Sequence, residues 1–415
     1  MGFVNRESFK IINNFGYLTI IQLFNLLFPL ILYPYLIRAV GKELYGEVLF
    51  AQSIAVYFSL FINYGFNIYG TKEISRYSQS KQRIAITLGR IFCVQLFFYF
   101  INIMTILIMF STTNWIENLF LYLFATYICF NEIAVPVWYF QGKEEMKYIA
   151  ICSFFSKITS LCLIIILVRD SSDYIYILFA YFIGTLVCFA FSFYKIFITD
   201  KNRFILPRSF SLKAVMVDSY PYFISHALGG ITSKSNSFLI GFFVGKVELA
   251  YYDLADKIIN IISVFFQNFS NAIFPNVAKS KDYNLVKKSI KISFLFSIII
   301  IIGLLFSSEF IISLLGGSDM VDAKDYLIML SATLIFRAIG PIISTSILVV
   351  NGLGKYLGSS FLIAFIIYLG GILCLYTFNW FSVQNLIIIF ILSLVFRVVY
   401  RMYILYSNNL KHWLV

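Results

Sequence analysis

Three basic residues, Lys157, Lys234 and Arg337, lie near the middle of long apolar stretches of this 415-residue chain. A charged side chain at the centre of a membrane costs about 2.5 to 3.5 kcal/mol on insertion scales, so such residues face protein or water. Three cations at that depth indicate an anionic ligand held by charge-assisted hydrogen bonds. A structural alternative is an ion pair, in which Lys157 or Arg337 neutralises Glu132. For Lys234 the flanking hydroxyl and amide side chains favour the ligand interpretation.

Polar residues recur at steps of three or four along several of the same stretches, which places them on single helical faces. The longest such stripe runs from Asp253 through Asn260 to Asn271. A polar face is disfavoured against lipid, so we expect these faces to line a water-accessible cavity. The predicted lining residues are Gln22, Asn25, Gln52, Asn63, Asn236, Asn260 and Gln267.

Titratable residues on the same faces leave several roles open. Asp253 and Asp256 could bind a coupling cation, H⁺ or Na⁺, or Asp253 could simply pair with Lys257 one turn further along the helix. His226 could relay protons, although a single histidine is more often a hydrogen-bonded packing residue. The sequence predicts neither a metal site nor a cofactor.

Membrane-spanning helices must position these residues. With 60% hydrophobic and only 13% charged residues, the chain has too little polar surface to cover a soluble globule. A spanning helix needs about 20 apolar residues, and the continuous apolar runs, which do not alternate as barrel strands do, predict an all-α fold with twelve transmembrane helices. The predicted spans are residues 14–36, 44–66, 86–110, 118–140, 149–168, 175–198, 220–244, 249–274, 290–315, 326–350, 356–378 and 385–406.

The net charge of +12 is distributed unevenly between the gaps. We count 23 Lys and Arg residues in the gaps assigned to the inside, including Arg397 and Arg401 near the C-terminus, against five in the opposite gaps. The positive-inside rule therefore predicts that both termini are cytoplasmic. This placement points to a multi-pass membrane protein, with the lipid bilayer rather than nucleic acid as its partner.

A short motif recurs in the second half of the chain. Val40-Gly41-Lys42 opens the second predicted span, and Val244-Gly245-Lys246 opens the eighth. Six spans separate the copies, so both halves enter the membrane with the same orientation, as in transporters built from parallel repeats. We therefore expect a six-helix bundle over residues 1–198, a cytoplasmic linker over 199–219 and a second six-helix bundle over 220–415.

Several chemistries are disfavoured by missing motifs. The Gly-Lys pairs are never followed by Ser or Thr, so the phosphate-binding loop of ATPases is absent, and with two histidines the chain has no H-E-x-x-H zinc motif. The six cysteines lie inside predicted spans without paired spacing, which is typical of small packing residues. A carrier is therefore favoured over an enzyme.

Three segments resemble a known family. They are residues 32–41 (LYPYLIRAVG), residues 63–75 (NYGFNIYGTKEIS) and residues 137–148 (VWYFQGKEEMKY). They are similar to the corresponding segments of the O-antigen flippases (Wzx), a polysaccharide biosynthesis protein family within the multidrug/oligosaccharidyl-lipid/polysaccharide exporter superfamily. The likeness covers nearly the whole chain and is looser in the second half.

The resemblance implies the MATE- and MurJ-like fold of two six-helix bundles around a cationic cavity. It implies a flippase of the bacterial plasma (inner) membrane that moves an undecaprenyl-diphosphate-linked oligosaccharide of O-antigen or another polysaccharide from the cytoplasmic to the outer leaflet by alternating access. The polar lining residues would then contact its sugars. A polysaccharide polymerase and a chain-length regulator would be its protein partners. Two alternatives stay open: a polymerase or ligase that acts on lipid-linked units, and a MATE-like antiporter of small molecules.

Overall fold

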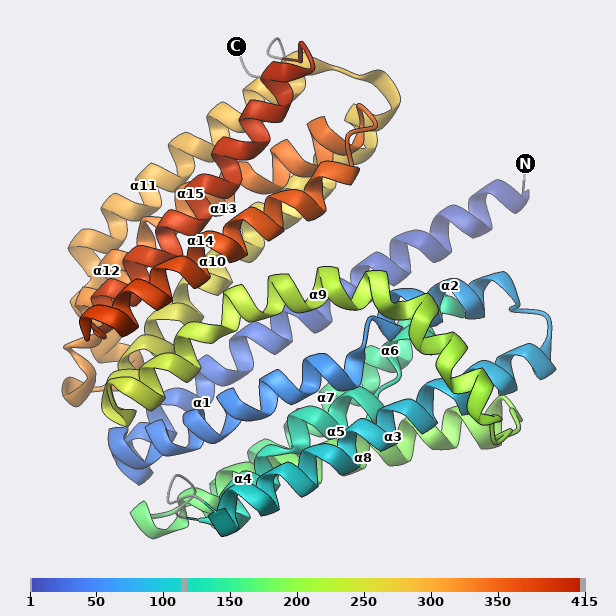
Figure 1. Ribbon diagram of the computed structural model, residues 1–415, viewed down its shortest axis with the longest axis horizontal. Coiled ribbons are helices and arrows are strands. Elements are labelled where there is room, and N and C mark those ends of the chain that lie inside the picture. Colours follow the sequence, from blue (N-terminus) through green and yellow to red (C-terminus); the bar gives the residue numbers. More distant parts are fainter. Residues whose placement is uncertain (1, 113–117, 411–415) are drawn as a thin grey trace. The chain divides into compact units, whose positions relative to one another are not determined.

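The computed structural model describes residues 2–112 and 118–410, and within them every regular element is a helix. This confirms the all-α prediction. The chain forms two compact units, Met1–Gly230 and Ile231–Val415. Figure 1 shows the helices of each unit running roughly alongside one another. Ten helical segments of the described residues are long and apolar enough to cross a membrane.

The first unit begins with α1 (Gly2–Asn63), which contains both of the first two predicted spans. Gly41 interrupts it with φ 79° and ψ 163°, a backbone conformation that only glycine adopts without strain. The other elements are α2 (Phe66–Arg76), α3 (Lys81–Thr112), α4 (Leu119–Ala125), α5 (Tyr127–Ala134), α6 (Val137–Gly142), α7 (Met146–Leu167), η1 (Ser171–Asp173), α8 (Tyr174–Phe193) and the π-helical η2 (Tyr194–Thr199).

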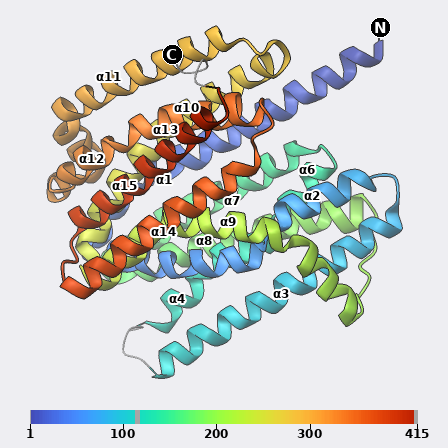
Figure 2. The same ribbon diagram turned by 45° about the horizontal axis from the view of Figure 1, so that its top comes forward.

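The helix α9 (Ser209–Phe243) begins in the first unit and ends in the second. Gly245 follows it with φ 153°, so the two copies of the Val-Gly-Lys motif both place a positive-φ glycine between helices. The second unit continues with α10 (Lys246–Ser280), α11 (Tyr283–Gly316), η3 (Ser318–Met320), α12 (Ala323–Ser331), α13 (Thr333–Ile342), the π-helical η4 (Ile343–Val349), α14 (Lys355–Phe378) and α15 (Val383–Ser407), seen from a second direction in Figure 2.

Two of the predicted spans are broken into shorter pieces. The fourth consists of α4, α5 and α6, with interruptions at Thr126 and Pro136. Proline lacks the backbone N–H that would continue the helix, which explains the second break. The tenth consists of α12, α13 and η4, and here Pro341 lies two residues before the π-helical segment begins. The two units thus share an interrupted span at the corresponding place.

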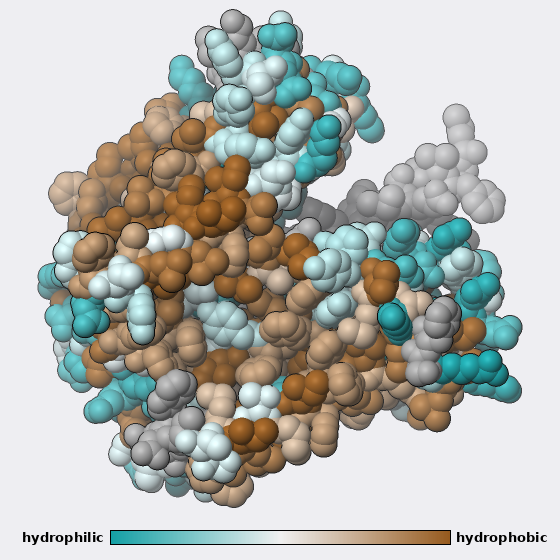
Figure 3. Space-filling view, in the orientation of Figure 1, coloured by the Kyte–Doolittle hydropathy of each residue, from teal (hydrophilic) through white to brown (hydrophobic). Residues whose placement is uncertain are grey.

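The exposed side chains are those of a protein solvated by lipid. On α11 the Phe306 side chain is 88% exposed, and Ile299 and Phe310 are exposed as well. Figure 3 shows hydrophobic atoms over much of the visible surface, with hydrophilic atoms gathered near helix ends. Helices pack closely where a glycine leaves room for a neighbouring side chain. A Cβ on Gly70 of α2 would lie 2.8 Å from the Trp138 indole of α6. The chain is a multi-pass membrane protein.

Candidate functional site

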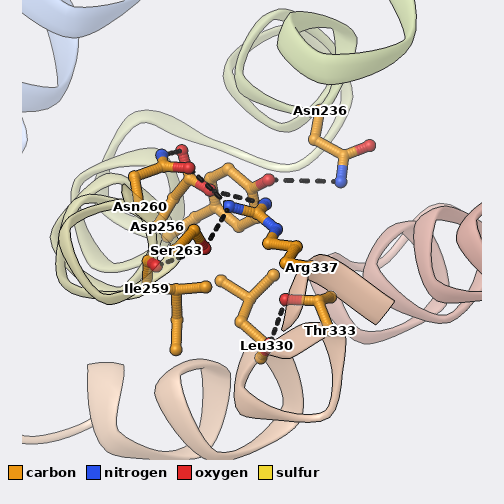
Figure 4. A network of polar contacts seen from close by, with 9 residues as sticks. Asn236, Asp256, Ile259, Asn260, Ser263, Leu330, Thr333 and Arg337 are labelled. Carbon is orange, nitrogen blue, oxygen red and sulfur yellow. Dashed lines mark hydrogen bonds and ion pairs between the residues drawn. The ribbon is translucent and has the colours of Figure 1, made fainter. Parts of the chain in front are cut away.

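In the second unit, Arg337 of α13 is the centre of a polar network (Figure 4). Its guanidinium donates hydrogen bonds to the side-chain oxygens of Asn260, at 2.5 Å, and Ser263, at 3.2 Å, on α10. The Asp256 carboxylate lies 3.9 Å from the other terminal nitrogen, at the outer limit of an ion pair. Asn260 also donates a hydrogen bond to Asp256 at 2.7 Å. The close partners of the guanidinium are therefore uncharged.

The stripe predicted on α10 forms one continuous helical face, and its residues differ in how far they are already paired. Asp253 forms an ion pair with Lys257 one turn away, which is the alternative to cation binding considered for this pair. At the other end, Gln267 donates a hydrogen bond to Asn271 at 3.1 Å. Only the middle of the stripe, Asp256 to Ser263, contacts Arg337.

Two residues from the end of α9 belong to the same unit. Asn236 is buried, donates a hydrogen bond to the Tyr252 hydroxyl at 3.3 Å and accepts one from the Tyr368 hydroxyl. Both tyrosines were missed at the sequence level, because an aromatic residue in an apolar helix gives no signal of its hydroxyl's partner. Lys234, two residues earlier, is exposed and within electrostatic range of Asp253.

In the first unit, Lys157 of α7 reaches α1. Its ammonium lies 5.5 Å from the ring centre of Phe24 and 5.1 Å from that of Phe28, and 3.5 Å from the Phe24 carbonyl oxygen. Two aromatic faces attract a cation without neutralising it. Among the described residues no carboxylate pairs with Lys157.

Glu132 has a different partner from the one weighed for it. Its carboxylate accepts a hydrogen bond from the Asn63 amide at 2.6 Å, and Gln95 donates to the Glu132 backbone carbonyl at 3.2 Å. Among the described residues Glu132 therefore forms no ion pair with Lys157. Gln52, on the same helix as Asn63, donates a hydrogen bond to the Tyr127 hydroxyl at 3.0 Å.

Three predicted residues stand apart from these contacts. His226 is exposed on α9 and forms no hydrogen bond with any described residue. The side chains of Gln22 and Asn25 lie outside the described part of the chain. Within the described residues, no group of three or more His, Cys, Asp or Glu side chains could hold a metal ion.

Arg397 and Arg401, which the charge count included with the C-terminus, both lie within α15. Arg401 is 4% exposed. An arginine near a helix end contributes to the charge count in the same way whether it extends into water or turns into the bundle, so the count did not indicate this burial.

Comparison with known proteins places the chain in a family. A model of a family described as "Polysaccharide biosynthesis protein" matches residues 11–281. The chain is 28% identical to the "Putative O-antigen transporter" of Escherichia coli (strain K12), covering 77% of this chain and 76% of that protein. It is 26% identical to a protein of the same name from Shigella dysenteriae, covering 83% of this chain and 88% of that protein.

The solved structures that it resembles have the same fold. The lipid II flippase MurJ in an inward closed conformation superposes with a TM-score of 0.73 at 15% identity, covering 95% of this chain and 88% of that one. An inward-facing multidrug resistance MATE transporter of the MOP superfamily gives 0.68 at 13% identity, covering 92% and 98%. The names of the two sequence relatives agree with the prediction of a transporter rather than an enzyme. Because the family model matches well over half of its length, this chain belongs to the polysaccharide biosynthesis protein family.

Proposed function

We propose that this protein is a flippase for undecaprenyl-diphosphate-linked O-antigen or polysaccharide repeat units. It would carry them from the cytoplasmic to the outer leaflet of the bacterial plasma membrane. The proposal includes twelve transmembrane helices, cytoplasmic termini and alternating access, in which the polar head passes through the protein while the lipid tail stays in the bilayer. Coupling to H⁺ or Na⁺, and contacts with a polymerase and a chain-length regulator, are further parts of the proposal.

The observation that carries the proposal is the way the deep cations are held. Arg337 is fixed by the amide oxygen of Asn260 and the hydroxyl of Ser263, with Asp256 only at 3.9 Å. Lys157 rests on two phenylalanine rings. Positive charge that neutral groups hold in place stays available to an anion, and a diphosphate accepts charge-assisted hydrogen bonds that are stronger in a low-dielectric site than in water.

The test is complementation of a strain that lacks this chain. Arg337→Ala should reduce long-chain surface polysaccharide severalfold, whereas Arg337→Lys should keep part of it and Arg203→Ala, in an exposed loop, should keep all of it. Immunoblots must show equal amounts of each variant in the membrane. Normal polysaccharide with Arg337→Ala would refute the proposed role of the cation.

The leaflet that holds the precursor separates the flippase from an enzyme. In the deletion strain, lipid-linked units should accumulate on the cytoplasmic face, where a membrane-impermeant lectin or hydrolase cannot reach them. Units that accumulate on the outer face without polymerising would indicate a polymerase or ligase instead.

A further inference from the structure

The last part of the chain contains several cations but no Asp or Glu. After Asp325 the sequence contains no Asp or Glu, yet this region holds Arg337, Lys355, Arg397 and Arg401. Four consecutive elements, α13, η4, α14 and α15, therefore provide no carboxylate of their own. Arg337 has Asp256 of α10 nearby. Arg397 and Arg401 form no ion pair with any described residue.

Arg401 is buried among neutral groups. Its Nε donates a hydrogen bond to the Ser360 hydroxyl of α14 at 3.1 Å, and a terminal nitrogen donates to the Gly340 carbonyl of α13, also at 3.1 Å. A guanidinium has five N–H donors, so these contacts hold it in place but leave its charge and most of its donors unused. Burying a charge without a counterion is costly, and residues 2–112 and 118–410 provide no such counterion for Arg401.

Arg397 lies one turn earlier on α15, and its hydrogen-bond donors are less well satisfied than those of Arg401. Its Nε is buried without any hydrogen-bond acceptor, while the side chain as a whole is only partly buried. The Phe361 ring lies 5.2 Å from the Arg397 guanidinium and 5.6 Å from that of Arg401. One ring thus lies beside two like charges four residues apart, an arrangement that is unfavourable without an anion.

Their chemistry suggests what that anion is. Arg401 precedes Ser407, the last residue of α15, by six positions and Arg397 precedes it by ten, which corresponds to about 9 and 15 Å along the helix axis. With a cytoplasmic C-terminus, as proposed above, both lie deeper than the inner-leaflet headgroups, so a phosphate that reaches them enters between the helices. Phosphate is the anionic group of membrane lipids, and Arg matches it with two parallel hydrogen bonds.

We propose that Arg397 and Arg401 form a binding site for the phosphate group of an anionic lipid, next to the Arg337 network. The Arg337 cation is within electrostatic range of Arg397. Phe361 and Ser360 position the two guanidiniums, and the phosphate oxygens accept hydrogen bonds from their unused donors. The phosphate comes either from a resident phospholipid or from the diphosphate of the polyprenyl-linked cargo. The membrane orientation used here rests on the proposed function, but the binding chemistry does not.

The test measures lipid binding directly, without transport. Full-length protein is purified in detergent, stripped of lipid and titrated with phosphatidylglycerol, undecaprenyl diphosphate or zwitterionic phosphatidylcholine, with native mass spectrometry as the readout. We expect Arg397→Gln to weaken binding of at least one anionic lipid by about tenfold, the size expected for losing a charge-assisted contact. Lys355→Gln, which removes an exposed cation of the same unit, should bind as the wild type does.

Each outcome bears on the proposal. A loss confined to undecaprenyl diphosphate assigns the phosphate to the cargo, and a loss that includes phosphatidylglycerol assigns it to a resident phospholipid. Equal affinities for the wild type and Arg397→Gln overturn the site. Melting curves show whether Arg397→Gln is folded; if it is not, Arg397→Lys takes its place, and unchanged affinity there also overturns the site. Binding of phosphatidylglycerol does not require flippase activity. This measurement therefore tests the lipid site even if the proposed flippase function is wrong.

Discussion

The Asn63 side-chain amide donates a hydrogen bond to the Glu132 carboxylate at 2.6 Å, and among the described residues no cation pairs with that carboxylate. The Asn63 side chain is 3% exposed, and its carbonyl oxygen has no hydrogen-bond partner. The contact therefore links the end of α1 to α5 through one strong bond between deep polar groups.

Asn63→Leu should destabilise the protein, because it removes the side-chain donor of the Glu132 carboxylate. An unsatisfied buried polar group costs about 1 to 3 kcal/mol, and more when it is charged. Glu132→Gln should cost less, since a neutral amide needs less compensation. Thermal melting in detergent checks both, and the Asn63→Leu, Glu132→Leu double variant should melt above Asn63→Leu alone. Equal melting temperatures for wild type and Asn63→Leu would contradict the importance of the bond.

Gly70→Ala should separate α2 from α6. A Cβ at this position would lie 2.8 Å from the Trp138 indole, and such overpacking costs about 1 to 3 kcal/mol. Gly358→Ala on α14 is the control, because nothing lies within 4 Å of its Cβ position and alanine favours a helix over glycine. The melting temperature should fall for the first variant and stay equal or rise for the second. A Gly70→Ala protein as stable as wild type would show that the indole can shift.

Lys195→Met should destabilise the part of the first unit where η2 meets α6 and α7. The Lys195 ammonium pairs with Asp200 and, at 3.1 Å, with Glu145, while the Tyr139 hydroxyl donates to Asp200 at 2.6 Å. Removing one partner of a buried pair costs about 3 to 5 kcal/mol, because the remaining charge is left without a counterion. The side chains here are 10% and 14% exposed for Lys195 and Asp200, so we expect the lower end of that range.

The control for this cluster is a charge-balanced variant. Lys195→Met combined with Asp200→Asn should recover part of the lost stability in chemical denaturation, since one unpaired carboxylate is removed. Equal stability of the single and double variants would mean that Glu145 or solvent already compensates Asp200.

Lys157→Met should reduce surface polysaccharide, if this cation contributes to cargo binding as proposed. The loss of one charge-assisted contact corresponds to about tenfold in affinity. Lys157→Arg should retain more activity, because a guanidinium also stacks on the rings of Phe24 and Phe28. Lys147→Met, an exposed position near the start of the same helix, provides the comparison. Full activity of Lys157→Met at normal protein levels would assign this lysine to packing alone.

The helical fold followed from the sequence because apolar run length and charge placement act locally. Gly41 and Gly245 marked helix breaks for the same reason: each needs a positive φ that other residues avoid. The break at Thr126 has no comparable signal, since neither glycine nor proline is there.

Side-chain partners were harder to predict than spans. The hydrogen bonds from Asn63 to Glu132 and from Arg337 to Asn260 depend on the rotation and axial position of helices that are far apart in sequence. The burial of Arg401 could not be predicted for a similar reason: only the positions of Ser360 and Gly340 decide that its side chain turns inward. A single sequence carries hydrophobic periodicity, but it does not encode helix register in a form that can be read directly.

The interrupted spans α4–α5–α6 and α12–α13–η4 have a mechanical consequence. Each is a series of short rods joined at a few residues, such as Thr126 and Pro136 in the first. A bending force on such a span is relieved by a few torsion angles at the joints, while the hydrogen bonds within each rod stay intact. Curvature can therefore change here at lower energetic cost than in an unbroken helix such as α14.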